Sequence, residues 1–390
     1  MADVKTNRAI KYRIKPNKAQ EQLLQQTFGC VRLVYNHYLG DRKDAYDNNG
    51  TSLNYSDNAN DLKRLKNELP FLKDVDSISL QQCLRHLDTA YKNFFRDKKV
   101  GFPRFKSKKN NHKSYSTVCV NENIFIESKH IKLPKIGKVK MVCHRPVPDD
   151  WKLKSVTVSQ EPDGKYYVSV LFEYVTSIVE VPSKTILGLD YSMSSLYVDS
   201  DGNSCGYPKF YKQALDRLAR EQRKLSKMEK GSNNYYKQRK KVARLHKHIS
   251  NQRKDFLHKQ STEIANRVDT VCIENLDMKK MSQEYNFGKT ISDNGWGLFT
   301  NYLEYKLRDR GKHYVKIDKF YPSSQICHCC GFKNEEIKDF AIRKWTCPKC
   351  KNEHDRDVNA AINIRNEGIK YLSINRTVGQ TGIARECCNH

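Results

Sequence analysis

The sequence of 390 residues contains no apolar run that approaches the roughly 18 residues of a bilayer-spanning helix. Its first five residues also lack the apolar stretch of a secretory signal peptide. We therefore expect an intracellular protein and not a membrane or secreted one. The length is about two and a half times the ~150 residues of a typical domain, which predicts two to four modules.

Acidic residues are scarce: 44 Asp and Glu stand against 71 Lys and Arg, which gives a formal net charge of +27. A surplus of this size favours a polyanionic partner, because cations that neutralise phosphates release condensed counterions. With 22 Tyr and 15 Phe in the chain, nucleic acid is a better candidate than a membrane surface. A basic protein that is merely soluble is the alternative.

The 13 cysteines do not indicate a disulfide framework, because five of them fall between positions 327 and 350. Two C-x₂-C pairs separated by sixteen residues predict a tetrahedral thiolate site formed by Cys327, Cys330, Cys347 and Cys350. Four protein ligands close such a site, so its zinc would be structural.

Other side chains near these pairs are not expected to bind the metal. Cys329 would break the register of the first pair, and His328, His354, Cys387 and Cys388 are expected to be bystanders. A redox-active cysteine pair is the alternative for each C-x₂-C.

Blocks of helix and strand follow one another along the first half of the chain. Alternation over residues 10–14 predicts a strand, and helical spacing predicts helices near residues 23–35, 62–69 and 78–95. Residues 115–175 read as short strands, with a hairpin turned at Asp163 and Gly164. This order predicts a small β-barrel that is split in sequence by a helical insertion.

Two basic stretches are candidates for contact with nucleic acid. Residues 96–113 hold eight Lys or Arg and one acid, with phenylalanines between them, which suits a phosphate backbone and stacked bases. Residues 209–267 hold 18 Lys or Arg and five acids on a predicted helical hairpin that turns near Gly231. A solvated charged surface is the alternative for both. The candidate contacts are Phe102, Arg104, Phe105, Lys106, Lys108, Lys109, Arg239, Lys240 and Lys241.

Acidic side chains follow two apolar strands. Residues 185–189 form a predicted strand that ends at Asp190, and residues 271–273 form one that ends at Glu274. A carboxylate at the end of a buried strand is costly unless it meets a metal or another cation. A helix predicted to start near Asp355 and Asp357 supplies further acids, although helix capping is the alternative role for Asp355.

In a ribonuclease-H-like fold, a mixed sheet places two strand-end acids beside an acid carried by a helix. Such a set can hold two Mg²⁺ or Mn²⁺ ions for phosphodiester hydrolysis, since these hard cations prefer oxygen ligands. Each acid taken alone has an ordinary structural explanation. Their joint order predicts a nuclease.

The motifs occur in the order G-L-D-Y-S (188–192), I-E-N-L (273–276), the paired C-x₂-C, and D-R-D-V-N-A-A-I-N-I (355–364). With this order the sequence resembles the TnpB family, transposon-encoded RNA-guided nucleases related to type V CRISPR effectors and to the eukaryotic Fanzor proteins. The likeness covers most of the chain and includes G-C-V-R-L-V-Y-N (29–36) and G-F-P-R-F-K-S-K (101–108).

The resemblance implies a multidomain α/β plus β architecture. Its expected parts are a split oligonucleotide-binding-type β-barrel (1–15 and 114–181), a helical recognition insertion (16–113), a RuvC nuclease domain (182–320 and 354–372), a zinc ribbon (321–353) and a C-terminal tail (373–390). Residue by residue, it implies that Asp190, Glu274 and Asp357 are the catalytic acids that hold magnesium. Asp355 is the nearby alternative for the third acid, and Arg343 is a candidate contact to the scissile phosphate.

The resemblance also implies partners and a reaction. These are a guide RNA, a double-stranded DNA target that carries a short adjacent motif, and cleavage of both strands at one site. The expected location is the cytoplasm of a prokaryote, in association with the nucleoid when DNA is bound, and monomer and dimer both stay open. A guide-RNA-dependent DNA-binding regulator and a transposition protein without useful cleavage are the alternatives.

Overall fold

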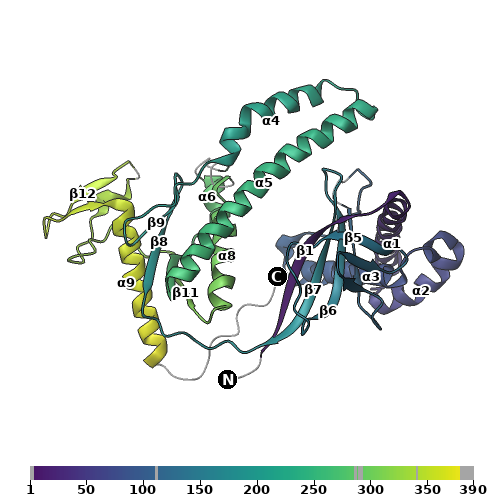
Figure 1. Ribbon diagram of the computed structural model, residues 1–390, viewed down its shortest axis with the longest axis horizontal. Helices are drawn as coiled ribbons and strands as arrows, with labels where there is room; N and C mark the ends of the chain where they lie inside the picture. The colour runs from purple at the N-terminus through teal and green to yellow at the C-terminus, as the bar shows by residue number, and fades with distance from the viewer. Residues whose placement is uncertain (1–3, 110–112, 285–287, 289–292, 340, 378–390) are drawn as a thin grey trace. The chain divides into compact units, whose positions relative to one another are not determined.

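The structure is a computed structural model that describes residues 4–109, 113–284, 288, 293–339 and 341–377. It divides into two compact units: residues 2–177 with 239–244, and residues 178–238 with 245–390. Each unit has its own hydrophobic core and its own β-sheet (Figure 1). None of the helices in the described part of the chain combines the length and hydrophobicity of a membrane span.

The first unit contains a seven-stranded sheet in the order β2-β6-β7-β1-β5-β4-β3. Strand β1 pairs antiparallel with both β7 and β5, so the start of the chain joins a sheet made by residues over 100 positions later. The strands are β1 Val4–Lys15, β2 Lys113–Val118, β3 Phe125–Glu127, β4 His130–Leu133, β5 Gly137–Val142, β6 Lys152–Gln160 and β7 Tyr166–Thr176.

Helices occupy the interval between β1 and β2. Helix α1 begins with a capping box between Asn17 and Gln20 and ends at Gly50, whose φ of 64° suits a residue without a side chain. Large apolar side chains such as Leu24 and Leu84 are fully buried against the sheet. The helices are α1 Lys18–Asn49, α2 Tyr55–Glu68, η1 Pro70–Lys73, α3 Ser77–Arg96 and η2 Lys98–Val100.

The second unit is built on a four-stranded mixed sheet in the order β11-β10-β8-β9. Strand β10 runs parallel to β8 and β11, whereas β8 and β9 form an antiparallel hairpin. The four strands are β8 Ile186–Ser192, β9 Leu196–Asp199, β10 Thr270–Glu274 and β11 His313–Ile317. A two-stranded sheet of β12 Lys344–Thr346 and β13 Glu353–Asp355 lies in the cysteine-containing segment.

Helices cover both faces of the mixed sheet. In Figure 1, α9 runs along one side of β8, and α5 and α8 lie on the other. Leu189 and Ile273 face the core with Leu257, Phe299 and Leu303 of α5 and α8. The helices are α4 Phe210–Ser226, α5 Asn233–Arg267, α6 Met278–Glu284, α8 Trp296–Arg308, η3 Glu335–Lys338 and α9 Arg356–Thr377.

Two glycines allow α9 to lie directly on the sheet. A Cβ atom at Gly188 would lie 2.0 Å from the carbonyl oxygen of Ala361, and one at Gly368 would lie 2.3 Å from the sulfur of Cys272. Such separations are impossible between real atoms, so a side chain at either position would push the helix away. The G-L-D and N-A-A motifs therefore meet in space, with Gly188 and Ala361 at the contact.

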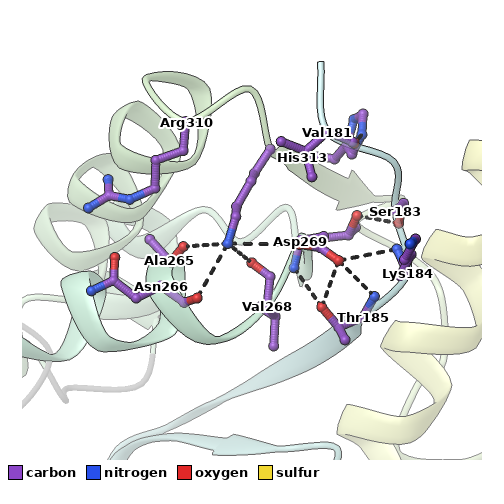
Figure 2. A network of polar contacts seen from close by, with 12 residues as sticks. Val181, Ser183, Lys184, Thr185, Ala265, Asn266, Val268, Asp269, Arg310 and His313 are labelled. Atoms are coloured by element: carbon purple, nitrogen blue, oxygen red, sulfur yellow. Dashed lines mark hydrogen bonds and ion pairs between the residues drawn. The ribbon is translucent and has the colours of Figure 1, made fainter. Parts of the chain in front are cut away.

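A polar network fixes the opposite edge of the sheet, where β8, β10 and β11 begin (Figure 2). The Asp269 carboxylate accepts hydrogen bonds from the backbone N–H groups of Lys184 and Thr185 and from the Thr185 hydroxyl. The Lys312 ammonium donates to the carbonyl oxygens of Ala265 and Val268, at the C-terminal end of α5. The network therefore aligns the starts of the parallel strands.

Most elements expected from periodicity are present. The helices of the first unit, the hairpin at Gly164 and the helical pair α4–α5 are confirmed. Gln238 of α5 donates to both the backbone and the side chain of Glu221 of α4, which joins the two helices at that point. The barrel stays a prediction: β2 and β3 are the outer strands of the seven-stranded sheet, and the described residues show no pairing between them.

One boundary prediction needs correction. Strand β8 does not end at Asp190 but continues to Ser192, because residues beyond Leu189 still pair with β9. Helix α9 extends to Thr377, so the expected domain boundary at residue 372 falls inside this helix. The finer domain divisions stay predictions, and residues 378–390, with Cys387 and Cys388, lie outside the described chain.

Candidate metal centres

Strand pairing places two of the predicted acids at one edge of the mixed sheet. Ile273 of β10 lies opposite Leu189 of β8 in parallel register, so Glu274 and Asp190 are the next residues on neighbouring strands. Side chains alternate along a strand. Asp190 therefore shares the α9-facing side with Gly188, and Glu274 shares it with Cys272.

Helix α9 brings the third acid to the same edge. Asp357 lies four residues before Ala361, about 6 Å along the helix, and Asp190 lies two residues after Gly188, about 6.5 Å along the strand. Because Gly188 and Ala361 touch, Asp357 and Asp190 are near neighbours. The Asp190 carboxyl interacts electrostatically with both Glu274 and Asp357.

Asp355 has a different position from Asp357. Its carboxylate accepts hydrogen bonds from the backbone N–H groups of Asp357 and Val358, which is the geometry of a helix N-cap. The side chain of Asp355 is exposed, whereas that of Asp357 is only 26% exposed. The alternative structural role considered for Asp355 is thus present in the structure, and Asp357 is the acid beside Asp190.

The environment opposes ionisation of the two strand-end acids. Burial raises the pKa of Asp190 well above its ordinary value, and the charges of Glu274 and Asp357 raise it further. Burial also raises the pKa of Glu274, although a hydrogen bond from the Ser323 hydroxyl opposes this shift. Asp199, at the end of β9, differs because it is paired with Arg267 at 2.9 Å.

Two arginines lie close to the acids. Arg343 Nη1 is 3.3 Å from one carboxylate oxygen of Asp357 and 3.4 Å from the other. Arg356 interacts electrostatically with Asp190 and donates to the backbone oxygen of Asp339. Among the described residues, the oxygens of the three acids do not all lie within 4.8 Å of one another.

The donor set fits a hard divalent cation. Buried carboxylates that repel one another are stabilised by a counter-charge, and oxygen donors are the ligands that Mg²⁺ and Mn²⁺ prefer. Arg343 supplies such a charge to Asp357, but Glu274 receives only the neutral hydroxyl of Ser323 among the contacts described. The arrangement can therefore hold cations next to a phosphodiester.

The four predicted cysteines form a second candidate metal centre. The sulfur atoms of Cys327, Cys330, Cys347 and Cys350 all lie within 4.8 Å of one another. We call the two C-x₂-C pairs the first and the second knuckle. Two sulfur–sulfur contacts join them: Cys327 lies 3.5 Å from Cys350, and Cys330 lies 3.6 Å from Cys347. These separations exceed a disulfide bond and suit four thiolates around one zinc ion.

The cysteines of the site differ in acidity: burial raises the pKa of Cys327, whereas the pKa of Cys347 is lowered. Gly331, at φ 73°, follows the first knuckle, and its N–H donates to the carbonyl of Cys327. Burial opposes ionisation of Cys347, yet the N–H groups of Cys350 and Lys349 and the adjacent thiols lower its pKa to about 6. A thiolate is the species that binds zinc.

The expectation that His354 does not bind the metal stays a prediction, but its side chain contacts the four-cysteine site. Its Nε2 lies 3.1 Å from the sulfur of Cys327, and its buried ring packs against Trp345 and His328. Position 354 lies on β13, which pairs with β12 on the other side of the second C-x₂-C pair. Cys329 is exposed and lies outside the four-sulfur group.

The basic segment after α3 is exposed in part. Arg104, Lys106, Lys108 and Lys109 are all exposed, and the Lys106 ammonium lies 3.9 Å from the centre of the Tyr35 ring. Phe105 is 58% exposed. Residues 110–112 lie outside the described chain.

Phe102 belongs to an aromatic wall. It is 46% exposed and contacts Tyr91 and Phe94 edge-on at 5.5 Å. Together with Tyr46 and Phe95 these rings line a cavity of about 620 Å³. The candidate contacts on α5 also reach the surface: Lys240 and Lys241 are exposed and Arg239 is half-buried.

Three polar residues that the sequence left unassigned connect the two centres. Asn359 and Asn363 of α9 are buried and hydrogen-bonded to the segment that holds Ser323 and the first knuckle. A spacing of four residues placed both asparagines on one helix face, which was the available signal. The partner of Ser323 could not be found this way, because Glu274 lies 49 residues earlier.

Comparison with known sequences extends these findings. Residues 161–284 match a family model described as "Probable transposase", and residues 296–364 match a Cas12f1-like TNB domain. A protein of Streptomyces pristinaespiralis named as an RNA-guided DNA endonuclease is 38% identical over 93% of this chain and 89% of its own. The chain belongs to the TnpB family.

Further relatives agree with this membership. InsQ of Escherichia coli, also named as an RNA-guided DNA endonuclease, is 33% identical over 96% of both chains. The TnpB-like protein L770 of Acanthamoeba polyphaga mimivirus is 23% identical over 94% of this chain and 75% of its own. Residues 1–51 match a model described as a helix-turn-helix domain, although the structure has strand β1 and one long helix there.

Among solved structures, a Cas12f1 chain from a complex with single-guide RNA and target DNA has a similar fold. The TM-score is 0.58 with 14% identity, over 93% of this chain and 99% of that one. This likeness extends across both units of the TnpB chain. It supports the mixed α/β architecture that the motifs imply.

Proposed function

We propose that the protein is an RNA-guided DNA endonuclease that cuts both strands of its target at one centre. The observation that carries the proposal is the convergence of Asp190, Glu274 and Asp357 at one sheet edge. These acids come from three separate segments, and they do so in a chain with close relatives named as RNA-guided DNA endonucleases.

Asp190, Glu274 and Asp357 would hold Mg²⁺ or Mn²⁺. When bound, such cations supply Lewis acidity toward a water nucleophile and toward the leaving 3′ oxygen of a phosphodiester. The protein orients the acids by fixed backbone positions: two neighbouring strand ends and the first turn of a helix docked at Gly188.

Arg343 is proposed to contact the scissile phosphate. Its side chain is 61% exposed while one nitrogen contacts Asp357, and a guanidinium has further N–H donors beyond those used there. A guanidinium is suited to paired hydrogen bonds with phosphate oxygens. The group therefore positions the phosphodiester next to the three carboxylates.

The structural zinc site is proposed at Cys327, Cys330, Cys347 and Cys350. It is closed by four protein ligands, so it organises the ribbon and does not activate water. The ribbon carries Arg343 between its two knuckles and ends at Asp355, directly before the turn that holds Asp357. Zinc loading therefore determines where these groups lie.

In this proposal the guide RNA, and not the protein, selects the DNA target. Guide RNA pairs with one DNA strand, and the protein holds the hybrid through its shape and charge while it reads only a short adjacent motif. The net charge of +27 and the exposed cations Arg104, Lys108 and Lys109 support this division of labour. The protein acts in the cytoplasm, where it meets the nucleoid.

Cleavage of a plasmid tests the proposal. The protein is purified with its RNA, that RNA is sequenced, and a plasmid with a matching target is incubated with it in Mg²⁺. Linear plasmid with 5′ phosphate and 3′ hydroxyl ends is the expected product. RNA-dependent binding without cleavage would identify the regulator instead, and joined DNA strands would identify a transposase.

A further inference from the structure

A chain of buried hydrogen bonds connects helix α9 to the second acid. The Asn363 side chain donates to the carbonyl oxygen of Ser323 at 2.8 Å and to that of Ile326 at 2.6 Å. The Ser323 hydroxyl in turn donates to one carboxylate oxygen of Glu274. Asn363 is 4% exposed and Ser323 is 6% exposed, so water does not compete for these bonds.

A second asparagine ties the same segment to the zinc ribbon. The Asn359 amide donates to the carbonyl oxygen of Ile326 at 2.8 Å. Its oxygen accepts from the backbone N–H of His328 at 3.1 Å and lies 3.0 Å from His328 Nδ1. His328 directly follows Cys327, so the two asparagines clamp residues 323–328 of the ribbon to helix α9, beside the acid.

We propose that Ser323 is a positioning residue for Glu274, and that Asn359 and Asn363 transmit the fold of the zinc ribbon to it. This inference rests on the proposed function and deepens it. Ser323 selects one carboxylate oxygen and leaves the other available to a cation. The ribbon therefore contributes to the nuclease centre through a hydroxyl as well as through Arg343.

The hydrogen-bond partner of Ser323 favours a positioning role over a purely structural one. A buried serine hydroxyl satisfies itself equally well on a backbone carbonyl, but here its partner is a titratable side chain on another element. Groups that orient metal ligands through hydrogen bonds typically contribute 10–100-fold to metal affinity or activity. Freed from Ser323, Glu274 would sample other rotamers and lose that preorganisation.

The test compares three serine variants in the complete complex of protein and RNA. Ser323→Ala removes the hydroxyl, Ser323→Thr keeps it, and Ser324→Ala alters the adjacent residue as the matched control. The probe is Mn²⁺ alone, titrated by electron paramagnetic resonance, together with the rate of plasmid cleavage. Zinc content and melting temperature show whether each variant is folded.

We expect Ser323→Ala to weaken Mn²⁺ binding and to slow cleavage by about 10–100-fold, with full zinc content. On a logarithmic scale, Ser323→Thr should regain at least half of the Mn²⁺ affinity and cleavage rate that Ser323→Ala loses. Ser324→Ala should match the wild type in both. Equal Mn²⁺ affinity and equal rates for Ser323→Ala and Ser324→Ala would overturn the proposal. A Thr variant no better than the Ala variant would also overturn it.

A double-variant comparison tests the clamp. Asn363→Ala should lower Mn²⁺ affinity in the same direction, and the pair Asn363→Ala with Ser323→Ala should be no worse than Ser323→Ala alone, because both act through one hydroxyl. If the fold-losses of the two single variants multiplied in the double variant, Asn363 and Ser323 would not act through the same hydroxyl. If the wild-type complex bound Mn²⁺ but cut no matched plasmid, the proposed function would fail while the Mn²⁺ titrations still tested Ser323.

Discussion

At the scale of single residues, the protein places negative charge where burial makes it unfavourable. Asp190 and Glu274 follow apolar strand residues, and burial raises the pKa of both. Asp199, by contrast, has Arg267 as a partner. The charge of Asp199 is thus balanced within the protein, whereas Asp190 and Glu274 would be stabilised by a bound cation. A functional site of this kind lowers the stability of the fold when the cation is absent.

The first prediction concerns Asp190→Asn. A folded-state pKa above the unfolded one means that the wild-type carboxyl stabilises the fold when protonated and loses that contribution as pH rises through the folded pKa. Without divalent cations at pH 7.5, the Asn variant should therefore melt at least about 2 °C higher, the shift expected from roughly 1 kcal/mol in a unit of this size.

Calorimetry at two pH values checks this prediction. The difference between Asp190→Asn and the wild type should shrink at pH 5, where more of the wild-type carboxyl is protonated. Saturating Mg²⁺ should also reduce it, since the cation stabilises only the wild type. A variant less stable than the wild type at pH 7.5 without cations would be inconsistent with a repulsive site.

The second prediction concerns Gly188→Ala. A Cβ there would lie 2.0 Å from the Ala361 oxygen, so α9 must move and carry Asp357 away from Asp190. We expect a loss of about 1–3 kcal/mol in unfolding free energy and loss of plasmid cleavage. Gly297→Ala in α8 is the control, because that position has open space and alanine favours a helix. Normal cleavage by Gly188→Ala would show that the close approach of α9 is not required.

At the scale of elements, the two ends of the parallel strands in the mixed sheet differ in role. The starts of β8, β10 and β11 are fixed by Asp269 and Lys312 (Figure 2), while the ends of β8 and β10 carry the acids. Because the strands are parallel and short, fixing one end determines the register at the other. The network is therefore expected to control the spacing between Asp190 and Glu274.

The third prediction concerns Asp269→Asn. Hydrogen bonds from Thr185 lower the pKa of Asp269 in the folded state, so its contribution to stability is present above the ordinary carboxyl pKa and is lost as pH falls. The variant should lose about 1–3 kcal/mol at pH 7, typical of bonds to a charged group. Denaturant titration measures this loss, and it should diminish toward pH 3. If Asp269→Asn and the wild type had the same free energy of unfolding at pH 7 as well as at pH 3, the network would not fix the register of the strands.

The elements themselves could be predicted well from the sequence, since apolar period and turn residues are local. Apolar spacing located α3 and the α4–α5 pair, and the C-x₂-C spacing identified the four thiols. The extension of β8 to Ser192 was missed because the strand continues beyond its apolar residues, through its hairpin pairing with β9. His354 and Ser323 were missed because their partners, Cys327 and Glu274, come from remote segments.

At the scale of the whole molecule, charge is the dominant property. The net charge of +27 predicts tight and salt-sensitive binding to nucleic acid. Arg104, Lys106, Lys108 and Lys109 in the segment after α3 are all exposed residues, but the Lys106 ammonium packs on Tyr35, and burial of that group lowers its pKa. The other three cations are therefore expected to neutralise phosphates.

The fourth prediction follows from that division. Replacing Arg104, Lys108 and Lys109 by Gln should weaken binding of an RNA–DNA hybrid of arbitrary sequence. It should also make the plot of log K against log salt shallower, by about 0.7–0.9 for each phosphate that the protein no longer neutralises. Lys106→Gln should leave the slope unchanged. Fluorescence anisotropy over a salt series measures both, and identical slopes for the triple variant and the wild type would exclude this segment from binding.

Guided cleavage by a matched set of acid variants tests the central claim most directly. The claim is that Asp190, Glu274 and Asp357 act together as one centre, while Asp355 only caps α9. Wild-type complex and Asp355→Asn should linearise a guide-matched plasmid in Mg²⁺, whereas Asp190→Asn, Glu274→Gln and Asp357→Asn should bind the target without cutting it. Cutting by any of the last three, or loss of cutting in Asp355→Asn with wild-type stability, would contradict the account.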